Sequence, residues 1–96
     1  MAERPVYAKS MCCIPGCPRW SRRFPREWLC AGHWRLLPRT WRVILRRTWS
    51  RESAWIDLNR ANGDRHSYVA ALRAIHAERR LWGRAKRFLI LHEAGL

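Results

Sequence analysis

The residues with the clearest chemical potential are the cysteines, all four of which lie within 22 residues of one another together with one of the four histidines. Counted from Cys12 to His33, the spacing is C-x4-C-x12-C-x2-H, which offers three thiolates and one imidazole. Such donors are typical of tetrahedral zinc sites, and four protein ligands fill the coordination sphere. The pattern therefore predicts one structural zinc ion per chain.

The identity of the first ligand is open on spacing alone, because Cys12 and Cys13 are adjacent. Cys13 would give a C-x3-C knuckle, which is also feasible. Disulfides and free thiols are the alternatives to a metal. A disulfide framework requires secretion, and residues 1–11 contain no apolar signal segment. We therefore expect reduced thiols and a metal.

The half-site Cys30-x2-His33-Trp34, with a glycine just before Cys17, resembles small zinc-binding proteins encoded by bacteriophages and prophages. The resemblance continues through the run that ends at Pro38 and into a basic helix that contains tryptophan. In that pattern four residues separate the first two cysteines, which implies the ligand set Cys12, Cys17, Cys30 and His33 and leaves Cys13 as the spare thiol.

This resemblance implies that the protein binds zinc and is encoded by a phage or prophage. It would then act in the cytoplasm of a bacterial host. Some of these proteins attach the knuckle to an HNH nuclease, but the present sequence has no His-Asn-His constellation. The remaining histidines, His66, His76 and His92, are spread along the last segment of the chain, with no nucleophile and base pattern around them. We expect a protein that is not an enzyme.

The elements that must hold the knuckle are helices. Cys30 and His33 are three residues apart, so a short helix over residues 31–37 would direct both side chains toward one ion. That helix should stop before Pro38, which suits the first turn of the next one. From residue 39 onward, apolar residues recur at helical spacing at Trp41, Ile44, Leu45 and Trp49. This helix either runs to about residue 59 or breaks near Ser50.

A second long helix is predicted to follow a turn at Asn62 and Gly63, which both accept a left-handed backbone, with Asp64 as its N-terminal cap. Gly83 is a point where it could bend. Its apolar stripe comprises Tyr68, Ala71, Leu72, Ile75, Trp82, Ala85 and Leu89. The sequence thus predicts a mainly α fold with a flexible lead-in over 1–11, a zinc knuckle with a short helix over 12–37, and a helical hairpin over 38–96 on which the knuckle packs.

Charge indicates the class of partner. Twenty basic residues against seven acidic ones give a formal charge of +13, and eighteen of the twenty are arginines, which suit bidentate phosphate contacts. The helical arginines predicted to contact nucleic acid are Arg39, Arg42, Arg46, Arg47, Arg73, Arg80, Arg84 and Arg87. Seven tryptophans should fill the core, with one or two left exposed as stacking platforms for bases.

Two other partners fit the same composition. One is an acidic surface of a host protein complex, such as transcription or defence machinery, which a phage effector would modulate, for example as an inhibitor of CRISPR interference. The other is an anionic membrane surface bound by the basic C-terminal helix. The sequence has no run of 18 apolar residues, so we expect no transmembrane segment.

Overall fold

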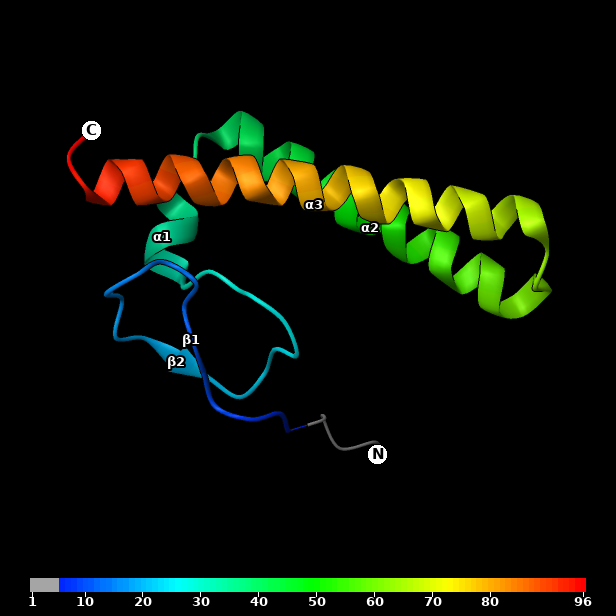
Figure 1. The fold of residues 1–96 in the computed structure, drawn as a ribbon, viewed down its shortest axis with the longest axis horizontal. Coiled ribbons are helices and arrows are strands. Elements are labelled where there is room, and N and C mark those ends of the chain that lie inside the picture. The colour runs from blue at the N-terminus through cyan, green and yellow to red at the C-terminus, as the bar shows by residue number, and fades with distance from the viewer. Residues whose placement is uncertain (1–5) are drawn as a thin grey trace.

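A computed structural model describes residues 6–96 of the chain and confirms the predicted mainly helical fold (Figure 1). Two long helices, α2 (Arg39–Asn62) and α3 (Arg65–Glu93), form an antiparallel hairpin. The short helix α1 (Ala31–Leu36) and a ribbon of two strands, β1 (Ser10–Met11) and β2 (Trp20–Ser21), lie beside the C-terminal half of α3. We refer to residues 6–37 as the N-terminal module.

The hairpin turn forms as predicted. Gly63 takes a left-handed φ of 63° and its N–H donates to the carbonyl of Asn59 at 2.7 Å, which ends α2. Asp64 then caps α3, because its side chain accepts from the N–H of Ser67. The Asn59 amide also donates to the Ser67 hydroxyl at 3.2 Å and ties the two helices together. Helix α2 continues through Ser50 and α3 continues through Gly83, so neither of the considered interruptions occurs.

The core lies where the N-terminal module meets the hairpin. Leu37, Leu45 and Leu89 are each at most 1% exposed. A row of three indoles crosses the boundary, with ring centroids 5.6 Å apart for Trp34 and Trp49 and 6.1 Å apart for Trp49 and Trp82. Each of these rings is large and apolar, so tryptophan supplies much of the packing in a chain that has only two Phe.

The predicted apolar stripe of α3 is partly wrong. Tyr68 is 54% exposed and Leu72 is 39% exposed, whereas Ser67 is buried. Near the hairpin turn the two helices are joined by a polar side-chain contact, so a small hydroxyl side chain that bonds to Asn59 fits between them better than a large ring. The buried positions 67, 71, 85 and 89 therefore lie on a face rotated away from Tyr68.

The first described residues are paired with the loop between Cys17 and Cys30. Ser10 lies opposite Ser21 in the β1–β2 ribbon, and the N–H of Tyr7 donates to the carbonyl of Arg22 at 2.9 Å. The predicted lead-in over 1–11 thus ends in a strand, and residues 1–5 of it lie outside the described residues. Between residues 6 and 96, the helices are all too short or too polar to cross a bilayer.

Candidate metal centre and arginine surface

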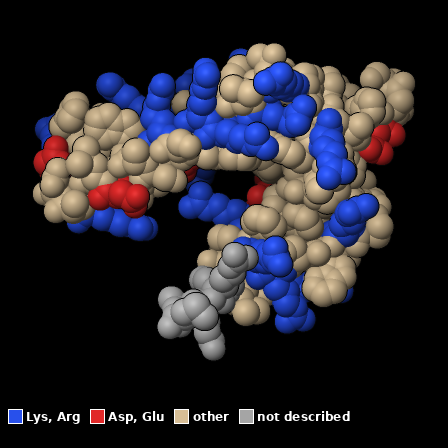
Figure 2. Space-filling view, turned by 180° about the vertical axis from the view of Figure 1, so that it is seen from behind, with Lys and Arg blue, Asp and Glu red and all other residues tan. Residues whose placement is uncertain are grey.

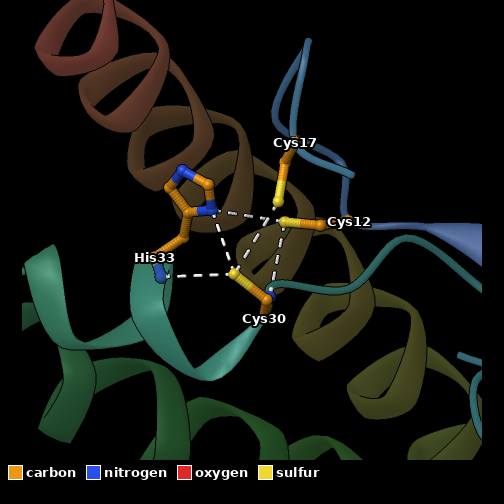
Figure 3. A group of neighbouring side chains, drawn as sticks. All are labelled: Cys12, Cys17, Cys30 and His33. Carbon is orange, nitrogen blue, oxygen red and sulfur yellow. Dashed lines mark hydrogen bonds between the residues drawn. The ribbon is translucent and has the colours of Figure 1, made fainter. Parts of the chain in front are cut away.

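A tight turn positions the first two of the four clustered ligands. The N–H of Cys17 donates to the carbonyl of Ile14 at 3.1 Å, which closes a four-residue turn around Pro15 and Gly16. Gly16 has a φ of 83°, as the third position of a type II turn requires, and proline suits the second position. The chain therefore reverses within the x4 spacing, and the sulfur atoms of Cys12 and Cys17 point to the same side (Figure 3).

Helix α1 positions the other two ligands. Cys30 is its N-cap residue, and the Cys30 sulfur accepts from the N–H of His33 at 3.4 Å. His33 lies one turn further along, so its ring stands above the Cys30 sulfur. The N–H of Cys30 in turn donates to the Cys12 sulfur at 3.3 Å. One backbone N–H thus donates to each of the Cys12 and Cys30 sulfurs, and each such bond favours the thiolate form.

The four donor atoms converge on one point (Figure 3). The sulfur atoms of Cys12, Cys17 and Cys30 and a ring nitrogen of His33 all lie within 4.8 Å of one another. The Cys17 and Cys30 sulfurs are 3.9 Å apart, and His33 Nδ1 is 3.6 Å from the Cys12 sulfur and 3.1 Å from the Cys30 sulfur. This group can hold a metal ion.

Cys13 does not belong to the cluster. Its N–H donates to the carbonyl of Trp28 at 2.9 Å, and it lines a separate depression with Tyr7 and Glu27. Burial, assisted by the charges of Cys12 and Glu27, raises the pKa of the Cys13 thiol to about 11. The structure thus brings Cys12 rather than its neighbour to the other three donors, as the resemblance implied.

The thiols of the cluster differ in acidity. Burial raises the pKa of Cys12. Burial acts in the same direction on Cys30, but hydrogen bonds from the backbone and side chain of His33 outweigh it and lower the pKa of Cys30 to about 7. At neutral pH the N-cap cysteine, Cys30, is therefore more readily available as a thiolate than Cys12.

Comparisons with protein-family models, curated proteins and solved structures give no match. The properties of this site consequently follow from its own geometry.

Two contacts that the sequence did not predict attach the N-terminal module to α3. His33 Nε2 lies 3.1 Å from Glu93 Oε1, and the Lys86 ammonium donates to the Glu27 carboxylate. His33 thus faces the cluster with Nδ1 and a carboxylate with Nε2. With a metal on Nδ1, Nε2–H would donate to Glu93, which is the arrangement that orients a metal-bound imidazole. Sixty residues separate His33 from Glu93, and no local pattern links residues so far apart.

Two of the eight predicted nucleic-acid contacts have structural partners. Arg42 is half-buried, and its Nε donates to the carbonyl of Leu37 at 3.1 Å, beside the junction of α1 and α2. The Arg46 guanidinium lies 5.5 Å from the centre of the Trp34 ring. Both side chains therefore help to dock the N-terminal module. Arg47, the next residue, points about 100° away from Arg46 around the helix and is not part of the Arg42 and Arg46 pair that docks the module.

The remaining six are exposed, and within residues 6–96 none of the eight forms a salt bridge. Helical spacing places Arg73, Arg80, Arg84 and Arg87 along one side of α3, roughly opposite Lys86 and Glu93. We call these four the α3 arginine row. Figure 2 shows basic side chains along the edge of the hairpin away from the N-terminal module. The two long helices thus leave one strongly positive side uncovered.

Proposed function

We propose that the four-residue cluster binds zinc as a structural ion. In a tetrahedral site with Zn–S near 2.3 Å and Zn–N near 2.1 Å, two sulfurs lie about 3.8 Å apart and a sulfur and a nitrogen about 3.6 Å apart. The distances of 3.9 Å between the Cys17 and Cys30 sulfurs and 3.6 Å between the Cys12 sulfur and His33 Nδ1 agree with these values. The Cys30 sulfur and His33 Nδ1 are 3.1 Å apart and would separate by about 0.5 Å around a bound ion. Thiolate and imidazole donors favour zinc over magnesium or calcium.

We further propose that the protein binds nucleic acid through the exposed arginines of the hairpin. The observation that carries this proposal is the α3 arginine row, four guanidinium groups on one side of a helix without a carboxylate partner in the described part of the chain. Phosphates spaced along a nucleic-acid backbone match such a row, and each contact releases counterions. The overall charge of +13 would speed the encounter.

Zinc has an indirect part in this function. The ion would lock the N-terminal module, which contacts α2 and the last turns of α3 and so braces the hairpin. The resemblance of the knuckle to phage-encoded zinc proteins supports a setting inside a bacterial host. In this proposal the module supports the binding surface and does not itself recognise the nucleic acid.

The test is fluorescence anisotropy with labelled single- and double-stranded oligonucleotides across a salt series. Wild-type protein should bind with a log affinity that falls linearly with log salt. The variant Arg80→Ala with Arg84→Ala should flatten this slope by about 1.8 on duplex DNA, because each lost phosphate contact removes about 0.9. Arg22→Ala with Arg23→Ala removes the same charge from exposed loop positions and serves as the control.

The expected result is that the control keeps most of the wild-type slope. An equal loss of salt slope in both variants would show that only total charge matters, and the assignment of binding to the α3 arginine row would be wrong. Failure of micromolar wild-type protein to bind either oligonucleotide at low salt would exclude nucleic-acid binding altogether.

A further inference from the structure

The uncovered side of the hairpin contains an open groove of about 610 Å³, lined by residues of α2 and α3. Its α3 wall includes Ala70, Ala74 and Ala77, and its α2 wall includes Ile44, which is 43% exposed. From His66 to Ala77 the lining follows α3 for eleven residues, or about 16 Å at 1.5 Å per residue. The groove is therefore about three helical turns long and has an apolar floor of small side chains.

Three arginines stand along this groove. Arg47 and Arg51 come from α2 and Arg73 comes from α3, and all three are exposed. The groove is lined by no carboxylate within residues 6–96, and none of the three arginines forms a salt bridge there. Trp55 and His66, whose rings meet edge to face at 5.7 Å, lie at the end nearest the hairpin turn. The groove thus combines an apolar floor with a positive rim.

We propose that this groove binds an acidic amphipathic helix of a partner protein. An amphipathic helix places an apolar stripe at spacings of three and four residues, which would cover the alanine floor. Small side chains on the floor let a third helix approach to the usual 8–10 Å between axes. Carboxylates on both sides of that stripe would meet arginines on both sides of the groove, where Arg–carboxylate pairs can be bidentate.

A second copy of the chain does not fit this description. The acidic residues of α2 and α3 are only Glu52, Asp57, Glu78 and Glu93, and Glu52 is buried. They form no acidic stripe, and two copies that each carry +13 repel each other. A nucleic-acid backbone would satisfy the arginines but would leave the alanine floor uncovered, because phosphates and sugars offer little apolar surface. The inference goes beyond the proposed nucleic-acid binding because it assigns the groove a protein ligand. The groove shares Arg47 and Arg73 with the proposed nucleic-acid surface, whereas Arg80 and Arg84 lie outside it.

The experiment uses a labelled 18-residue peptide with leucines at i, i+3, i+4 and i+7 spacing and glutamates on both flanks. Binding to the full zinc-loaded chain is followed by fluorescence anisotropy, and the alanine methyl groups are followed by NMR. A scrambled peptide of the same composition keeps the charge and loses the stripe. The designed peptide should bind, shift the methyl signals of Ala70, Ala74 and Ala77, and exceed the scrambled peptide by about tenfold in affinity.

Matched variants locate the site. Arg47→Glu with Arg51→Glu should weaken peptide binding by about tenfold or more, whereas Arg80→Glu with Arg84→Glu, the same charge change outside the groove, should weaken it by less than about threefold. Ala77→Trp fills the floor without changing the charge and should also weaken binding by about tenfold. Circular dichroism and zinc content confirm that each variant is folded.

Any one of four results would overturn the proposal. The first is that the scrambled peptide binds as well as the designed one, and the second is that neither peptide binds. The third is that the two charge-reversal variants weaken binding equally, which would indicate nonspecific attraction. The fourth is that a labelled oligonucleotide shifts the same alanine methyl signals and its binding is insensitive to Ala77→Trp, which would assign the groove to nucleic acid.

Discussion

The contact between His33 and Glu93 makes a quantitative prediction about metal affinity. Glu93 is the carboxylate that faces the His33 ring, with Nε2 and Oε1 3.1 Å apart. Glu93→Ala leaves every donor of the cluster in place but removes the group that fixes the orientation of the imidazole. The expected result is weaker zinc binding by a chain that still folds as a helical hairpin.

The size of the effect follows from the geometry. Loss of such an outer partner typically weakens metal binding by 10–100-fold. The His33 side chain is 12% exposed, but the Glu93 side chain is 46% exposed, so water can replace part of the lost contact. We therefore expect a loss of zinc affinity at the lower end of this range, about tenfold, which corresponds to about 1.4 kcal/mol. Glu93→Gln keeps an acceptor oxygen, so it should lower the zinc affinity by less than Glu93→Ala does.

The assay is competition for zinc between the protein and a chromogenic chelator at fixed pH. Asp57→Ala is the matched control, because it also removes one exposed carboxylate, from a position in α2 that is not part of the cluster. The control should retain the wild-type affinity. If Glu93→Ala binds zinc as tightly as Asp57→Ala does, the end of α3 has no part in orienting the imidazole and the reasoning is refuted.

Three further predictions test the cluster, the core and a buried carboxyl group. Cys17→Ser should lose metal and the fold of the N-terminal module, whereas Cys13→Ser should retain about one zinc per chain by elemental analysis. Leu45→Ala should lower the free energy of unfolding in urea by about 2–5 kcal/mol, because Leu45 is fully buried, while Leu58→Ala, at a side chain that is 43% exposed, should cost less than about 1 kcal/mol. Burial, with the charge of a neighbouring carboxylate, raises the pKa of Glu52, so its ionisation destabilises the folded chain as the pH rises. Glu52→Gln should accordingly increase the free energy of unfolding at pH 7, by an amount that shrinks as the pH falls toward 4.5; a gain that is independent of pH would contradict this reasoning.

The local features of the fold could be predicted from the sequence because short-range chemistry determines them. Pro38 limits α1 and Gly63 ends α2 through the backbone preference of a single residue, and Asp64 begins α3 through its capping side chain. The ligand spacing likewise determined which part of the chain forms the cluster. Spacing alone did not decide between Cys12 and Cys13 as the first ligand. That choice depends on which of the two adjacent side chains points toward the other three donors.

Tertiary features were predicted less well. Apolar periodicity placed Tyr68 in the core, but the helix interface near the turn is held by the polar pair Asn59 and Ser67. The arginines were grouped by position along each helix, whereas the structure divides them between docking and exposed roles according to what packs beside them. Arg46 lies over Trp34, and Arg47 lines the groove. Such divisions depend on where the N-terminal module sits, which no local pattern determines.

The contacts of Glu27 with Lys86 and of His33 with Glu93 join residues that are 59 and 60 positions apart. During synthesis the knuckle leaves the ribosome before most of α3 has been made, and the ion can enter it at that stage. The clasp that holds the loaded knuckle against the hairpin closes only when the last turns of α3 have emerged. These two long-range contacts are therefore among the last to form, after the residues of the proposed metal site have already been made.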